Sequence, residues 1–150
     1  MNRNTEILQN LRRMIKFYER TESDICDQYH LSQIEIDIIA FLHNNPGKDT
    51  ASDIVELRML PKGNVSQAVE LLIQKGFLQR TQDTSDRRRI HLSLTEHTDR
   101  LIPDIMSARA DFLEQIFSGF SQEERALYYE MNYRIFRNAT EGLERKKHQS

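Results

Sequence analysis

Residues 71–95 read LLIQKGFLQRTQDTSDRRRIHLSLT, and the period of the apolar residues changes within this stretch. A helical pattern ends at Gly76, because glycine adopts the left-handed conformation that closes many helices. Residues 77–80 and 90–94 then have the composition of two short strands, and the second strand alternates apolar and polar residues. The polar residues 81–89 between them predict an exposed hairpin tip.

Upstream of this stretch, local signals divide the chain into short helices. Ser32 and Glu35 form a capping box, in which each side chain satisfies a free backbone N–H of the other residue. Pro and Gly within residues 44–47 end the helix that this box begins. Thr50 begins a third helix, and Pro61 suits the first turn of a fourth, because its missing N–H would be unpaired there. The third helix is expected to end near Leu57.

Long amphipathic helices are predicted on both sides of this region, because apolar residues recur there three or four positions apart. They are Ile7, Leu11, Met14, Tyr18 and Ile25 in the first segment and Ile102, Ile105, Met106, Phe112, Leu113, Ile116, Phe117 and Phe120 in the segment after Thr95. A last helix, which a capping box of Ser121 and Glu124 begins, carries Leu127, Met131 and Ile135. One small lobe cannot cover so much apolar surface, so we expect a second copy of the chain to cover it.

The overall composition indicates a folded, helix-rich protein. The chain has 150 residues, of which 38% are hydrophobic and 29% charged. It has no apolar run near the roughly 20 residues that cross a bilayer, and the N-terminus does not resemble a signal peptide. Its single cysteine fits a reducing compartment, so we expect a cytoplasmic protein without membrane contact. Because the sequence contains no phosphate-binding loop or nucleophile motif, we expect neither an enzyme nor a cofactor.

The net charge of −2 hides an uneven distribution. Residues 58–91 contain seven Lys or Arg and three Asp or Glu, which gives this stretch a charge of +4, and the remainder carries −6. A basic segment within an acidic chain is typical of a surface that docks electrostatically on a polyanion.

Two short helices followed by a charged hairpin constitute a winged helix-turn-helix, a DNA-binding motif. The candidate contacts on the second helix are Lys62, Gly63, Asn64, Ser66 and Gln67, and those on the wing are Asp86, Arg87 and Arg88. Amide side chains pair with adenine edges, whereas lysine and a helix N-terminus favour phosphate. Guanidinium groups at an exposed tip suit a minor groove or its phosphates, and a neighbouring carboxylate such as Asp86 can orient one of them.

Residues 32–101 resemble the DNA-binding core of the MarR family of bacterial transcription regulators. Residues 71–80 are similar to the family pattern Leu…Lys-Gly-Leu-Ile-x-Arg, and residues 85–95 are similar to its wing, Asp-x-Arg-x…Leu-x-Leu-Thr. The chain departs from the pattern at Thr98, where the family usually has glycine. The resemblance implies that Asp86 supports Arg88 and that Arg88 enters a minor groove. It also implies that the first and last helices intertwine with those of a second chain.

The expected fold is mainly α (α+β), a winged helix-turn-helix with N- and C-terminal dimerisation helices. We expect a single domain over 1–150, with the DNA-binding lobe at 31–95 and dimerisation helices at 1–30 and 96–150. The expected function is that of a homodimeric repressor that binds a pseudo-palindromic operator in double-stranded DNA. By the same resemblance, a small-molecule effector would bind between the dimerisation helices and the lobe.

The sequence leaves three alternatives open. Cys26 could sense oxidants, although no Lys or Arg close in sequence would activate its thiol. Cys26 and His30 have metal-ligand spacing on one helical face, but two ligands do not make a site, and we expect no metal. The positions that resemble the ligands of the family's zinc-sensing branch hold Ile36 and Asp37. Winged helices also bind proteins, and steep salt dependence would distinguish a DNA-binding module from such a protein-binding one.

Overall fold

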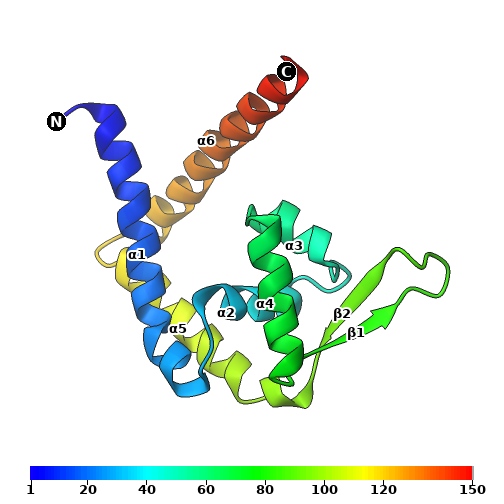
Figure 1. Cartoon of the computed structure of the whole chain (residues 1–150). Coiled ribbons are helices and arrows are strands. Elements are labelled where there is room, and N and C mark those ends of the chain that lie inside the picture. The colour runs from blue at the N-terminus through cyan, green and yellow to red at the C-terminus, as the bar shows by residue number, and fades with distance from the viewer. Residues whose placement is uncertain (150) are drawn as a thin grey trace. The chain divides into compact units, whose positions relative to one another are not determined.

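Figure 1 shows the computed structural model of the chain, which describes the backbone of residues 1–149 and the surroundings of side chains up to residue 147. The chain forms two compact units, residues 1–112 and the segment from residue 113 onward. In chain order the elements are α1 (Arg3–Tyr29), α2 (Gln33–Asn44), α3 (Ala51–Arg58), α4 (Lys62–Gln74), β1 (Leu78–Gln82), β2 (Ile90–Leu94), a short 3₁₀ helix (Glu96–Thr98), α5 (Leu101–Ile116) and α6 (Gln122–Gln149). The predicted class, mainly helical with a winged helix-turn-helix, is confirmed.

Helix α2 is the centre of the first unit and contacts α1, α4 and β2. Its residues Ile36, Ile38 and Ile39 are fully buried. The fully buried side chains of the neighbouring elements include Ile54 of α3, Val65 and Leu72 of α4, and Leu101 and Ile105 of α5. Full burial of one such side chain stabilises a fold by roughly 1.5–3 kcal/mol. This shared core packs α2, α3, α4 and the hairpin against one another.

The helix-start signals are confirmed at α2 and α3. Both the Ser32–Glu35 and the Thr50–Asp53 capping boxes are present. Gly76 has the left-handed φ of 86° that the end of α4 requires. Pro61 differs from the prediction, because its ψ of 134° makes it the N-cap residue of α4, one position before the first turn.

The first strand also differs, since β1 begins one residue later than predicted and continues to Gln82. The Phe77 N–H donates to the Leu72 carbonyl oxygen at 2.9 Å, a bond that closes α4 and delays the start of the strand. The strands are antiparallel, with Leu78 opposite Leu94 and Gln82 opposite Ile90. The hairpin tip therefore comprises residues 83–89.

A buried polar cluster joins three further helices to α2. Asp37 accepts hydrogen bonds from the Tyr18 hydroxyl at 2.8 Å and from Arg109 at 3.1 Å, and it pairs with Arg58 at 3.4 Å. Arg109 also lies 3.6 Å from the fully buried carboxylate of Glu22. Burial and the Asp37 charge raise the pKa of Tyr18 well above its ordinary value, so its hydroxyl stays protonated. These contacts tie α1, α3 and α5 to the central helix.

In the second unit, the predicted capping box is present at the start of α6. The Ser121 N–H donates to Glu124 at 2.8 Å, and the Glu124 N–H donates to the Ser121 hydroxyl at 3.1 Å. Phe117 is buried against Tyr128 and Tyr129. Besides Tyr128 and Tyr129, the exposed large apolar residues of α6 include Leu127, Met131, Tyr133, Ile135, Phe136 and Leu143. None of the described helices is long and apolar enough to cross a membrane.

Candidate nucleic-acid interface

Helix α4 has one buried and one exposed face. Val65, Ala68, Val69 and Leu72 are buried. All five predicted contact residues of this helix, Lys62, Gly63, Asn64, Ser66 and Gln67, are exposed in its first two turns. The exposed face therefore presents an ammonium group, two side-chain amides, one hydroxyl and a helix N-terminus without a side-chain cap, which are groups that bind phosphates and base edges.

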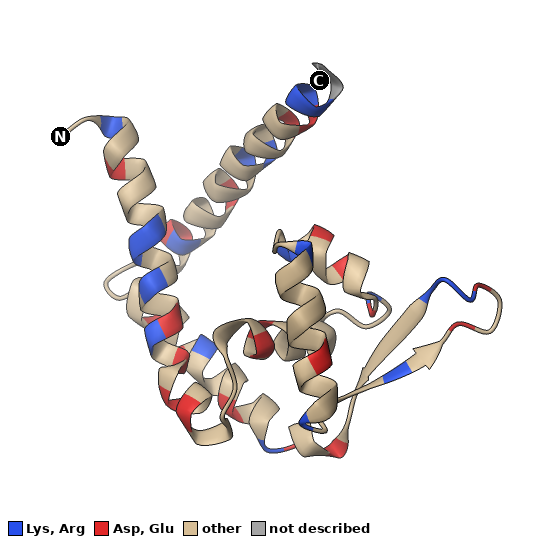
Figure 2. Ribbon diagram, viewed as in Figure 1, with Lys and Arg blue, Asp and Glu red and all other residues tan. Residues whose placement is uncertain are grey.

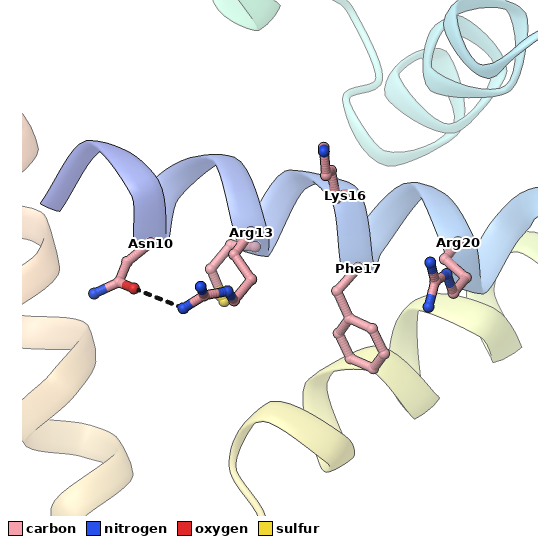
Figure 3. A pocket seen from close by; sticks show the side chains of 6 residues that line it. Asn10, Arg13, Lys16, Phe17 and Arg20 are labelled. Atoms are coloured by element: carbon pink, nitrogen blue, oxygen red, sulfur yellow. Dashed lines mark hydrogen bonds between the residues drawn. The ribbon is translucent and has the colours of Figure 1, made fainter. Parts of the chain in front are cut away.

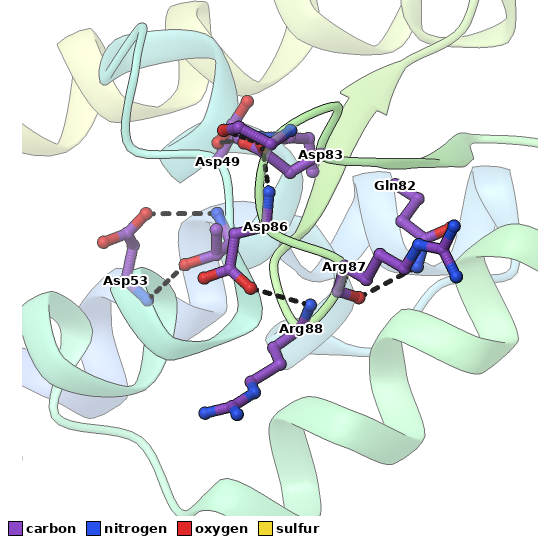
Figure 4. Close-up of polar contacts among 10 residues, drawn as sticks. Asp49, Asp53, Gln82, Asp83, Asp86, Arg87 and Arg88 are labelled. Carbon is purple, nitrogen blue, oxygen red and sulfur yellow. Dashed lines mark hydrogen bonds and ion pairs between the residues drawn. The ribbon is translucent and has the colours of Figure 1, made fainter.

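The wing tip is folded by its own aspartates (Figure 4). Asp83 Oδ1 accepts hydrogen bonds from the N–H of Ser85 at 2.8 Å and from the N–H of Asp86 at 3.0 Å. The Gln82 side-chain amide donates to the Arg87 carbonyl at 2.9 Å. These local bonds give an exposed loop a defined backbone path, which sets where its three consecutive arginines project.

The contact between Asp86 and Arg88 is not the one that the sequence suggests. Asp86 Oδ1 accepts the backbone N–H of Arg88 at 3.0 Å, and no ion pair joins Asp86 to a guanidinium group within the described chain. Figure 4 shows the Arg88 side chain extending away from the Asp86 carboxylate. Asp86 therefore shapes the backbone beneath Arg88 and leaves its guanidinium group available for another partner.

The seven cations of residues 58–91 separate into two groups. Three of them have internal partners: Arg58 pairs with Asp37, Lys75 pairs with Glu35 at 3.0 Å, and Arg80 pairs with Glu70. The other four, Lys62, Arg87, Arg88 and Arg89, have no ion pair among the described residues. All four are exposed, at the start of α4 and on the wing tip. Figure 2 shows these basic positions at the start of α4 and on the outer part of the hairpin.

The sequence reasoning missed part of this surface. An open groove of about 540 Å³ lies between the wing and the N-terminus of α3, where Thr50, Ala51 and Ser52 face Arg88 and Arg89. The motif around Thr50 was interpretable from the sequence only as a helix cap. Its position opposite the wing places the start of α3 beside Arg88 and Arg89, and the carboxylates of Asp53 and Asp86 line the same groove.

Comparisons with known proteins agree with this geometry. Residues 30–89 match the model of the MarR family. The chain is 28% identical over 121 residues to the HTH-type transcriptional regulator PecS of Dickeya dadantii, covering 79% of this chain and 73% of PecS. The chain is therefore similar to the MarR family of transcription regulators over its DNA-binding lobe.

Solved structures of other proteins share the fold over most of the chain. The Staphylococcus aureus MepR–DNA complex has a TM-score of 0.76 at 16% identity and covers 92% of this chain and 98% of MepR. Bordetella bronchiseptica BpsR, whose DNA binding is regulated by 6-hydroxynicotinic acid, has a TM-score of 0.72 at 17% identity, with 89% of this chain and 92% of BpsR covered. The family match over residues 30–89 and the similarity to PecS indicate a DNA-binding transcription regulator.

Cys26 and His30, the residues considered for oxidant sensing and metal binding, do not gather into a cluster with other ligand side chains among the described residues. Burial raises the pKa of the half-buried Cys26 thiol, as does the nearby Glu22 charge, so the reactive thiolate is disfavoured. His30 occupies the left-handed C-cap of α1 with a φ of 55°. Among the described residues, no group of three or more His, Cys, Asp or Glu side chains could hold a metal ion.

Proposed function

We propose that the protein is a repressor that binds a pseudo-palindromic operator as a homodimer. In each protomer, α4 enters a major groove, and the wing reaches the adjacent minor groove. One observation carries this proposal. Three cations of residues 58–91 pair with carboxylates of the same chain, whereas the other four are exposed at the start of α4 and on the wing tip. Arginine and lysine without internal partners are available to replace the counterions of a DNA backbone.

The roles within this surface follow from chemistry. Lys62 and the N-terminus of α4 contact phosphate, which positions the helix without reading sequence. Asn64 and Gln67 lie further along the same exposed face and bond base edges. Arg88 enters the minor groove, and Arg87 with Asp86 belongs to the same wing contact. Gly63 and Ser66 are small enough to let the helix approach the DNA backbone closely.

Dimerisation is supported by apolar residues that remain exposed in the single chain. On α1 these are Ile7, Leu8, Leu11 and Ile15, whose exposed fractions range from 43% to 64%. Helix α6 exposes a second series that includes Leu127, Met131 and Ile135. Covering such surfaces removes apolar area from water, and two recognition helices then meet half-sites about 34 Å apart.

The decisive experiment selects DNA fragments from a random pool with the intact chain and then measures their affinity at several salt concentrations. We expect an inverted repeat and steep weakening with salt. If each of the four exposed cations of a protomer neutralises one phosphate charge, wherever it lies on the DNA, a dimer has a slope near −7, at about −0.9 per neutralised phosphate. Salt-independent binding, or selection without sequence enrichment, would contradict the proposal and favour a protein-interaction module.

The proposal includes a small anionic effector that binds on α1, one of the expected dimerisation helices. A groove of about 580 Å³ lies there, and Figure 3 shows the side chains that line it. It is lined by Asn10, Arg13, Met14, Lys16, Phe17 and Arg20. Figure 3 shows Arg13 and Arg20 on the same side of α1 as Phe17, whereas Lys16 points to the other side. Guanidinium groups near an aromatic ring suit an aromatic carboxylate. That BpsR responds to 6-hydroxynicotinic acid supports this class of ligand.

Calorimetry with 6-hydroxynicotinic acid as the probe tests the effector site. We expect binding by the native chain, loss of binding in a combined Arg13→Ala and Arg20→Ala variant, and retention in the control Arg12→Ala. Arg12 is exposed on the same helix but does not line the groove. Equal binding by all three proteins would refute this site.

A further inference from the structure

His91 of β2 lies between two carboxylates from different parts of the DNA-binding lobe. Its Nδ1 is 2.7 Å from Asp49 Oδ1, and its Nε2 is 2.7 Å from Asp83 Oδ2. Asp49 lies in the loop between α2 and α3, and Asp83 is the first residue of the wing tip. The imidazole ring therefore connects the wing to the loop that leads into α3.

Both contacts are hydrogen bonds only if the ring is protonated. A neutral imidazole has a single N–H and would direct a lone pair at the other carboxylate, whereas imidazolium donates from both nitrogens. The hydrogen bonds to Asp49 and Asp83 accordingly raise the pKa of His91. The reciprocal bond from His91, with those from Ser85 and Asp86, holds the pKa of Asp83 well below its usual range.

The neighbouring charges do not alter this assignment. The carboxylates of Asp49 and Asp83 are the charged groups that act on the His91 ring in the described structure. Two nearby cations, Lys48 beside Asp49 in the chain and Arg89 two residues before His91, act on the carboxylate of Asp53 at the start of α3. The two anions facing His91 thus favour its charged form.

The His91 bridge acts on the part of the wing that carries the arginines. While Asp83 Oδ2 bonds His91, its Oδ1 accepts the N–H groups of Ser85 and Asp86 that fold the tip. On the other side, the Leu92 N–H donates to the Asp49 carbonyl oxygen at 2.7 Å. One charged ring therefore couples the fold of the tip to the position of the α3 start.

We propose that His91, as an imidazolium ion, is a positioning residue for DNA binding: it holds the wing tip against the loop preceding α3 and thereby orients Arg88 and Arg89 toward the DNA. This inference rests on the proposed function and adds a pH dependence to it. As pH rises through the elevated pKa of His91, one of the two hydrogen bonds is lost, and the tip is released. DNA affinity is therefore retained below the ordinary histidine pKa of about 6.5 and falls at higher pH.

The first test measures the affinity of the intact chain for its selected duplex between about pH 6 and pH 9, at one salt concentration. For the native protein we expect affinity to fall about five- to tenfold over this range, the scale of one hydrogen bond of average net strength. His91→Gln binds more weakly at the acidic end and shows a flat profile. His97→Gln is the matched control, since its ring packs against Phe77 away from the tip, and it keeps the native profile.

A native pH profile in His91→Gln would overturn the role of His91 while leaving the proposed function intact. Absence of DNA binding by the native protein at every pH would overturn the proposed function itself. The two failures are therefore distinguishable.

The second test needs no DNA and uses nitrogen-15 resonances of the histidine rings in the native chain. We expect both His91 ring nitrogens to be protonated near neutral pH, with a titration above that of an ordinary histidine. Asp49→Asn lowers the His91 pKa, whereas Asp99→Asn, in the control position after the 3₁₀ helix, leaves it unchanged. A ring that is neutral at pH 7 in the native protein would refute the bridge, whatever the folding of the His91 variant.

Discussion

Replacement of Arg88 by alanine tests the wing directly. The Arg88 side chain is exposed and has no ion pair in the described chain, and its backbone bond to Asp86 survives the substitution. Arg88→Ala should therefore leave the thermal stability of the protein unchanged. The substitution should instead weaken the free energy of DNA binding by about 1–3 kcal/mol per half-site, which is a 5- to 150-fold loss of affinity.

The matched control is Arg80→Ala on β1 of the same hairpin. Arg80 already pairs with Glu70, so its loss removes an internal partner and should change DNA affinity little. Both variants are compared by fluorescence anisotropy on the selected duplex at constant salt, with sedimentation to verify that the oligomeric state is the same. If Arg88→Ala binds as tightly as the native protein, or if Arg80→Ala loses as much, the separation of paired from available cations is wrong.

Three further outcomes are expected. Gln67→Ala should broaden the selected sequence at one position per half-site, whereas Lys62→Ala should keep the sequence and flatten the salt slope by about one phosphate contact per protomer; identical selection and salt profiles for both would reject this division. Deletion of 121–150 should produce a monomer in sedimentation and abolish tight operator binding. The thermal midpoint of the native chain should rise with protein concentration. A folded native monomer at micromolar concentration would exclude the dimer. Lys75→Met should lower the free energy of unfolding by roughly 1.5–3 kcal/mol in urea titration, because it leaves the buried Glu35 carboxylate without its cation; an unchanged midpoint would show that water replaces the pair.

The helix starts were predictable from the sequence because capping is a local interaction. Ser32 and Glu35 lie three residues apart, and their two reciprocal bonds need no other part of the chain. The same holds for Gly76, whose left-handed φ closes α4. The exposed arginines of the wing were equally predictable, since a polar run between two short strands has nowhere to be buried. These local signals, with the resemblance to one family, were enough for the fold class and for the candidate contact residues.

Only the tertiary structure decided which charges are available. Lys75 and Glu35 are 40 positions apart, and His91 and Asp49 are 42 apart, so neither pair has a signature in sequence spacing. Their side chains meet because the apolar core packs α2, α4 and β2 together, and the core residues are not the residues that form the pairs. Sequence patterns describe neighbours within a turn or a strand, where the backbone sets the distance. The partners of Lys75 and His91 depend on distances that only the packed core sets.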